Sequence, residues 1–94
     1  MNITLEFMGF PDVVSAIGEK KLEMEAGGTV GDLIAALVQQ YGQRVKDSFY
    51  NPDGHFDLNI QVIMNGEEFL SVDKHDRPLK GGDEVMFMLA MAGG

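Results

Sequence analysis

Two stretches near the N-terminus alternate apolar and polar residues with a period of two. In residues 2–7 every odd position is apolar, and in residues 21–26 every even position is apolar. This alternation is typical of a strand with one buried and one exposed face. The sequence therefore predicts two strands, which we expect to form an antiparallel pair with one solvated face.

The clearest helical periodicity lies in residues 30–41, where apolar residues recur every three or four positions. They are Val30, Leu33, Ile34, Leu37, Val38 and Tyr41. This spacing places all of them on one face of an α-helix. Thr29 is a suitable N-cap with Asp32 three residues later, as in a capping box, and Gly42 can take the positive φ that often ends a helix. The pattern predicts a helix that covers the core.

Residues 43–58 show no regular period and are predicted to be irregular. Within them, Asn-Pro-Asp-Gly at 51–54 is a typical turn sequence. We expect three apolar side chains to hold this segment against the core: Val45, Phe49 and Phe56.

Apolar and β-forming residues return in the last third of the chain. The predicted strands cover residues 60–64, 67–70 and 85–89, with a tight turn over 79–84. Asn65-Gly66 is a strong signal for a type I′ hairpin between the first two of these strands. Residues 85–89 are apolar on both faces, which indicates a strand at the centre of a sheet.

The order of these elements predicts an α+β protein with a β-grasp (ubiquitin-like) fold. We expect a mixed four- to five-stranded sheet packed against one main helix, with the first and last strands parallel at its centre. Residues 1–94 are predicted to be a single domain that ends in a flexible C-terminal tail at about 90–94.

The amino-acid composition excludes several classes of function. The 94 residues include 7 basic and 15 acidic side chains, for a net charge of −8, and no cysteine. The lack of cysteine excludes disulfides, thiolate metal sites and a cysteine nucleophile. Nucleic-acid binding needs a basic footprint, which is missing. The chain contains neither an apolar run of membrane-spanning length nor a signal-peptide pattern, so we expect no membrane partner and a cytoplasmic location.

Few side chains are candidates for catalysis or for binding a metal or cofactor. His55 and His75 stand among loop aspartates, and we expect them to be solvated rather than metal-bound, because their spacing does not resemble a metal site. The Gly-rich stretch 27–31 lacks the Lys-Ser/Thr ending of a phosphate loop. The serines show no base partner in the sequence. We therefore expect no catalytic set of side chains, no metal and no bound cofactor.

The C-terminus offers a different kind of functional group. The chain ends Met91-Ala92-Gly93-Gly94, and the last two residues have no side chain and wide backbone freedom. Four extended residues reach about 13 Å, far enough to carry a carboxylate into another protein's active site. The carboxylate of Gly94, with an ordinary pKa of about 3.5, is ionised near neutral pH. It becomes a good acyl donor only after activation by ATP, and a partner must catalyse that step.

Four sequence segments resemble the MoaD/ThiS family of ubiquitin-like sulfur carriers, and among them most closely MoaD, the small subunit of molybdopterin synthase. They are Thr-Val-Gly-Asp-Leu at 29–33, Val-Ile-Met-Asn-Gly at 62–66, Leu-Lys-Gly-Gly-Asp-Glu-Val at 79–85 and Met-Ala-Gly-Gly at 91–94. The resemblance implies that an E1-like enzyme adenylates Gly94 with ATP and that a sulfur donor converts the adenylate to a thiocarboxylate. It also implies that a larger MoaE-like subunit accepts the tail while sulfur passes to the molybdopterin precursor.

Two alternatives stay open. The same chemistry could serve thiamin, cysteine or another product, or could tag proteins through an isopeptide bond. In a different class, the chain could be a ubiquitin-like binding module whose tail has no chemistry.

The last predicted strand also provides a candidate contact surface. A period of two places Met86 and Met88 on the face opposite Val85 and Phe87. One face must meet the helix, and the other either binds a partner or is covered by residues 43–58. We favour the partner. The predicted partner-binding residues are Met86, Met88, Met91, Ala92 and Gly93.

Overall fold

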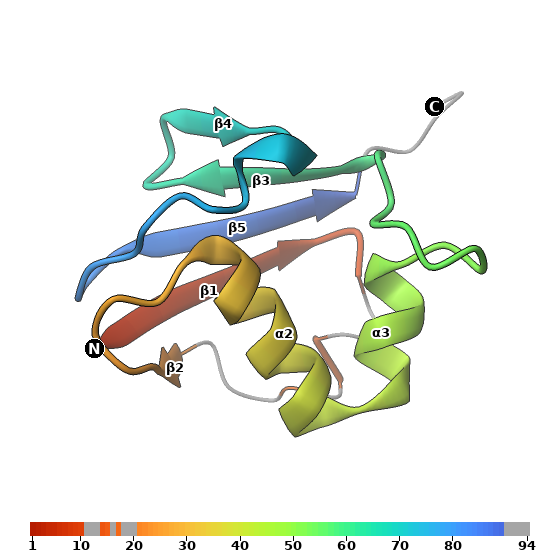
Figure 1. Cartoon of the computed structure of the whole chain (residues 1–94), viewed down its shortest axis with the longest axis horizontal. Coiled ribbons are helices and arrows are strands. Elements are labelled where there is room, and N and C mark those ends of the chain that lie inside the picture. Colours follow the sequence, from red (N-terminus) through yellow and green to blue (C-terminus); the bar gives the residue numbers. More distant parts are fainter. Residues whose placement is uncertain (11–13, 16, 18–20, 90–94) are drawn as a thin grey trace.

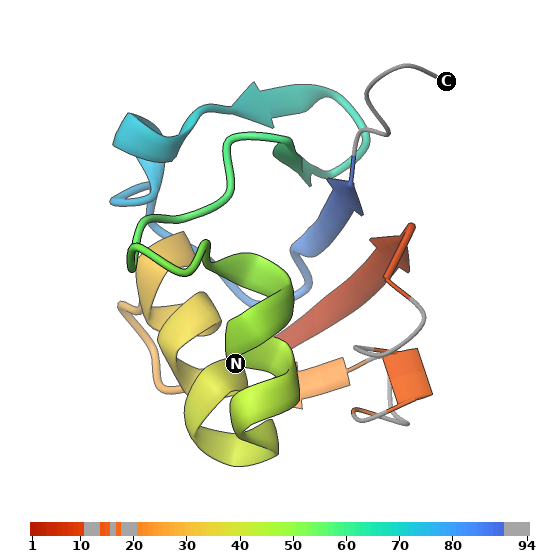
Figure 2. The ribbon, with the colours of Figure 1, turned by 90° about the vertical axis from the view of Figure 1, so that its right-hand side faces the viewer.

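The computed structural model describes residues 1–10, 14, 15, 17 and 21–89. In this part of the chain the strands are β1 (Asn2–Met8), β2 (Lys21–Glu23), β3 (Ile60–Met64), β4 (Glu68–Leu70) and β5 (Glu84–Leu89). The helices are α2 (Val30–Tyr41) and α3 (Gln43–Phe49), and a short 3-10 helix spans Val72–Lys74. Figures 1 and 2 show α2 and α3 on the same side of one sheet. The predicted α+β class is confirmed.

The sheet has five strands in the order β2-β1-β5-β3-β4. β1 and β5 are parallel, with Leu5 beside Val85 and Phe7 beside Phe87, whereas β1–β2, β3–β5 and β3–β4 are antiparallel. The chain thus forms the mixed sheet of the β-grasp fold. The prediction that the first and last strands pair in parallel at the centre of the sheet is confirmed.

The core lies between the sheet and the two helices. Val85 and Phe87 of β5 are fully buried, as are Leu33 and Leu37 of α2. Because alternate residues of a strand point to opposite faces, β5 directs Val85 and Phe87 toward the helices and Met86, between them, away from the helices. Burying each of these aliphatic or aromatic side chains stabilises the fold by roughly 1.5–3 kcal/mol before conformational entropy is subtracted.

Helix α2 has the boundaries and the cap that its sequence predicts. The Thr29 hydroxyl accepts a hydrogen bond from the Asp32 amide at 3.2 Å, and the Asp32 carboxylate accepts one from the Thr29 amide at 3.0 Å. This reciprocal pair satisfies two amides that would otherwise have no partner within the helix. At the other end Gly42 has a φ of 81° and its amide donates to the Val38 carbonyl.

Residues 43–58 are not wholly irregular, so that prediction was wrong for the first half of the segment. Gln43–Phe49 form α3, which starts directly after Gly42. The helix is seven residues long, too short to show a clear period, and its two buried residues, Val45 and Phe49, lie one turn apart. The expected anchoring of this segment is confirmed, because Val45, Phe49 and Phe56 are all buried.

Strand β2 is shorter than predicted, ending at Glu23 rather than at residue 26. The Gly28 amide donates to the Glu25 carbonyl at 3.4 Å, so the chain turns there toward α2 instead of extending the strand. The hairpin between β3 and β4 agrees with its sequence signal. Asn65 and Gly66 both have positive φ, 55° and 73°, as a type I′ turn requires.

Candidate functional site

Strand β5 leads directly to the C-terminal residues. It is the middle strand of the sheet, and its last residue, Leu89, pairs with Ile60 of β3. Four of the predicted site residues, Met91, Ala92, Gly93 and Gly94, lie outside the described residues. Their roles in catalysis and partner binding therefore stay predictions. The last described residue is Leu89, from which the tail starts. We call Leu89 the tail root.

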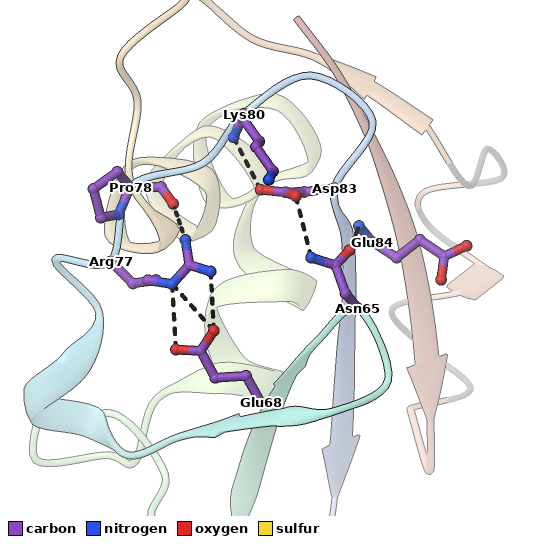
Figure 3. A network of polar contacts seen from close by, with 7 residues as sticks. All are labelled: Asn65, Glu68, Arg77, Pro78, Lys80, Asp83 and Glu84. Carbon is purple, nitrogen blue, oxygen red and sulfur yellow. Dashed lines mark hydrogen bonds and ion pairs between the residues drawn. The ribbon is translucent and has the colours of Figure 1, made fainter.

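A buried carboxylate fixes the start of β5 (Figure 3). Asp83 is only 2% exposed, and its side chain accepts hydrogen bonds from the Lys80 amide at 2.9 Å and the Asn65 side-chain amide at 3.2 Å. Asn65 in turn accepts from the Glu84 amide at 2.8 Å. The Asp83 carboxylate therefore orders this turn. The network joins the β3–β4 hairpin to β5 and so helps to set the register of the central strand.

A second contact holds the loop that precedes this turn. Arg77 donates to both carboxylate oxygens of Glu68 on β4, with the shortest distance at 2.9 Å, as Figure 3 shows. The hydrogen bond from Arg77 lowers the pKa of Glu68 and raises that of Arg77. Both side chains are solvent-accessible, so we expect the pair to orient the loop more than to stabilise the fold.

Met86 and Met88 lie on the sheet face that points away from the helices. Both are half-buried, whereas their neighbours Val85 and Phe87 are buried. The alternative that residues 43–58 cover this face is wrong. Phe49 of α3 packs against Phe87 with a centroid distance of 5.1 Å, which places α3 on the core side of the sheet.

The strand register brings further apolar residues onto the face of Met86 and Met88. Met88 lies beside Met8 of β1, and Met86 lies beside Ile63 of β3, which is itself opposite Phe69 of β4. Met8 is 53% exposed and Phe69 is 65% exposed. We call this surface the outer patch, and it consists of Met8, Ile63, Phe69, Met86 and Met88. The sequence analysis missed Met8, Ile63 and Phe69, because only the pairing of the strands places them together.

Acidic side chains border the outer patch. Glu6 lies beside Met86 in the β1–β5 register, and Glu84 is two residues before it on the same face of β5. Both are exposed. The patch therefore combines an apolar centre with a negative edge, in a chain whose net charge is −8.

An apolar hollow of about 340 Å³ lies beside the outer patch, at the end of the sheet where the tail starts. Leu58, which is 79% exposed, and Phe69 line it together with Ile60. Because Ile60 is the partner of Leu89 in the β3–β5 ladder, the hollow adjoins the tail root. A side chain of a docked protein could enter it.

The two histidines do not form a reactive group with their neighbours. His75 was expected to be solvated, but it is partly buried and packs edge-on against Phe56 with a centroid distance of 4.9 Å. This burial lowers the pKa of His75. His55 is exposed, and its backbone amide donates to the Asp53 carboxylate. Among the described residues, no three histidine or acidic side chains gather closely enough to hold a metal ion.

Within the described ranges, no helix is long and apolar enough to cross a lipid bilayer.

Comparison with known proteins gives the family. The model of the ThiS family matches residues 8–94, which include the tail, α2, α3 and the strands from β2 to β5. The chain belongs to the ThiS family. The resemblance drawn from the sequence motifs is therefore confirmed. No curated protein matches this ThiS-family chain.

Several solved structures share the fold of this ThiS-family member. Small archaeal modifier protein 1 of Haloferax volcanii aligns over 100% of both chains with a TM-score of 0.75 and 23% identity. A Pyrococcus furiosus protein assigned as molybdopterin converting factor, subunit 1, aligns over 97% of this chain and 99% of its own, with a TM-score of 0.66 and 21% identity. A chain of the BexX/CysO complex of Amycolatopsis orientalis aligns over 98% and 99%, with a TM-score of 0.66 and 23% identity.

These identities are low, so the structural likeness establishes the fold, and the family match carries the functional class. The family match supports a ThiS-family sulfur carrier, and the solved structures support its ubiquitin-like fold. What this chain's own geometry adds is an exposed apolar patch and a hollow next to the strand that leads to the Gly-Gly end.

Proposed function

We propose that this protein is a sulfur carrier whose reactive group is the C-terminal carboxylate of Gly94. The observation that carries the proposal is the position of the outer patch, which shares the end of the sheet with the tail root at Leu89. A partner that docks on the patch therefore holds the tail close to its own surface. The family match over residues 8–94 supports the same assignment.

The proposed chemistry has two steps, both catalysed by an E1-like adenylating partner. A carboxylate oxygen of Gly94 attacks the α-phosphorus of ATP, pyrophosphate leaves, and an acyl adenylate forms. A sulfur donor then supplies a hydrosulfide equivalent that attacks the carbonyl carbon and displaces AMP, leaving a thiocarboxylate and releasing a proton. ATP is a substrate of the partner and not a cofactor of this chain. We place the reaction in the cytoplasm, where ATP and reduced sulfur are both present.

The outer patch is the proposed docking surface for the partners. Met86 and Met88 were the residues expected from the sequence, and the structure adds Met8 and Phe69 beside them. Methionine side chains adapt to different apolar surfaces, which suits a carrier that must bind an activating enzyme and then a sulfur acceptor. The acidic border formed by Glu6 and Glu84 favours partners with basic side chains around an apolar contact.

We propose molybdopterin synthesis as the pathway that receives the sulfur. In this assignment a MoaE-like large subunit binds the precursor and accepts the Gly93-Gly94 tail in its active site. The motifs at 79–85 and 91–94 support the assignment, as does the likeness to the Pyrococcus furiosus protein assigned to a molybdopterin converting factor.

A second candidate function is that of a protein modifier. The observation that favours it is the likeness to small archaeal modifier protein 1, over the whole length of both chains. In this case a lysine amine of a target attacks the activated carbonyl of Gly94, AMP or a thiol leaves, and an isopeptide bond forms. A docking patch beside the tail root would serve either function.

Intact-mass measurement tests the carrier function. The protein is co-expressed with the E1-like enzyme of its own organism and a sulfur source. We expect its mass to rise by the difference between one sulfur and one oxygen atom. A variant that lacks Gly94 is the control and must show no shift. An unchanged mass in the intact chain under these conditions would contradict the carrier function.

The pathway is tested by recovering the acceptor. The thiocarboxylated protein is used as bait in an extract of the same organism. Recovery of a MoaE-like subunit supports molybdopterin synthesis, recovery of a thiazole synthase rejects it, and covalent adducts on target lysines identify the modifier function. Adding the purified acceptor and its precursor should then return the bait to the mass of the carboxylate form.

A further inference from the structure

Gly9 lies against the tail root. It directly follows Met8, the last residue of β1, which pairs with Met88 in the parallel β1–β5 ladder. A Cβ placed on Gly9 would lie 3.2 Å from the Leu89 Cβ and 3.2 Å from the Leu89 carbonyl oxygen. Both distances are shorter than an ordinary van der Waals contact. A side chain at position 9 would therefore require Leu89 to move by a few tenths of an ångström.

The contact falls on the part of Leu89 that begins the tail. The Leu89 carbonyl belongs to the first peptide unit after β5, and on its other side Leu89 pairs with Ile60 of β3. The tail root is thus held between Gly9 and β3. Gly9 also has a φ of +84°, which other residues adopt only with strain.

The residues on either side of Gly9 have different environments. Met8 is exposed on the outer patch, whereas Phe10 is buried and packs edge-on against Phe49 with a centroid distance of 5.6 Å. The chain bends at Gly9, between an outward and an inward side chain. The anchoring of Phe10 in the core keeps Gly9 in place against Leu89.

We infer that Gly9 is a positioning residue, which sets the direction in which the tail leaves Leu89 when a partner is bound to the outer patch. This inference rests on the proposed function. Five extended residues beyond Leu89 span at most about 17 Å, so when a partner holds the tail extended, a change of about 10° at the root moves the far end by roughly 3 Å. A displacement of about 1 Å between reacting groups can lower a rate as much as about 100-fold. The direction of the tail at Leu89 should therefore change the rate of the step at the Gly94 carboxylate more than it changes the affinity of docking.

Kinetic constants of the E1-like enzyme, with this protein as the varied substrate, separate the two effects. ATP–pyrophosphate exchange is measured for the wild type and for Gly9→Ala, which places a methyl group against Leu89. We expect kcat to fall at least about tenfold while KM stays within about threefold. Met8→Ala should show the opposite pattern, a raised KM with kcat nearly unchanged.

The control for backbone strain is Gly54→Ala. Gly54 has a φ of +90°, close to that of Gly9, but a Cβ added at Gly54 would meet no other atom within 4 Å. It belongs to the exposed turn at 51–54, and we expect both kinetic constants to equal those of the wild type. If Gly9→Ala and Gly54→Ala have the same kcat, the inference is wrong while the proposed function stands. If the wild type itself supports no exchange, both are wrong.

A second pair of variants covers the case in which Gly9→Ala does not fold. Leu89→Gly removes the Cβ that a side chain at position 9 would meet, whereas Leu89→Ala keeps this atom and loses the rest of the side chain. We expect kcat to fall several-fold in Leu89→Gly and to stay near the wild-type value in Leu89→Ala. Equal kcat values for the two variants would also overturn the inference.

Discussion

Replacing Phe69 by alanine should weaken partner binding without weakening the fold. Phe69 is 65% exposed, and its position opposite Ile63 places it on the outer patch at the edge of the apolar hollow. A phenylalanine buries at most about 200 Å² at an interface. Roughly 130 Å² of this area is therefore free to be covered by a partner.

At roughly 25 cal/mol per Å², complete coverage of this area stabilises a complex by at most about 3 kcal/mol. Alanine keeps part of the contact, and interface area converts incompletely into affinity, so we expect a loss of about 1–2 kcal/mol. This corresponds to a Kd about 5 to 30 times higher. The free energy of unfolding should change by less than about 0.5 kcal/mol, because exposed side chains contribute little to stability.

Titration calorimetry with the E1-like enzyme measures the Kd, and urea denaturation of the free protein measures the stability. Val14→Ala is the matched control, since Val14 is also an exposed apolar residue, at 42%, but lies outside the five strands. If Phe69→Ala binds as tightly as the control, the outer patch does not dock the enzyme. If Phe69→Ala instead lowers the urea midpoint strongly, Phe69 belongs to the core and the assignment of the sheet face is wrong.

Three further predictions concern the fold. Leu37→Ala should lower the free energy of unfolding by about 2–5 kcal/mol, because Leu37 is fully buried under the sheet; an unchanged urea midpoint would contradict its place in the core. Asp83→Ala should lower it by about 1–3 kcal/mol, since two partly buried hydrogen bonds to the Asp83 carboxylate are lost, and amide exchange at the start of β5 should become faster; unchanged protection there would argue against the network. Burial against Phe56 lowers the pKa of His75 below its ordinary value of 6.5, so the unfolded state binds the proton more readily and stability should fall as the pH drops below about 6.5. His75→Gln should remove this part of the pH dependence in thermal melts between pH 7.5 and pH 5, and a parallel pH profile in wild type and variant would refute the assignment.

Local sequence signals predicted α2 and the β3–β4 turn correctly. The cap formed by Thr29 and Asp32 and the turn at Asn65-Gly66 both depend on residues that are neighbours in sequence. The interactions that stabilise the cap and the turn lie within a few residues of each other, so tertiary contacts did not alter either structure. Helix α3 was missed because its two buried side chains, Val45 and Phe49, give too little pattern over seven residues. Its position is decided by the aromatic packing of Phe49 against Phe87.

The amino-acid sequence by itself determined the class of fold, the order of its main elements and the chemistry available at the end of the chain. Each of these follows from periodicity, composition or residue type along a single segment. Tertiary structure decided which residues form the outer patch beside the strand that leads to the C-terminus. Met8, Phe69 and Met88 are far apart in sequence and meet only through the pairing of four strands, and the approach of Gly9 to Leu89 depends on the parallel β1–β5 ladder. Strand pairing is a long-range property, because the register that brings two side chains together is set by the whole sheet and its core.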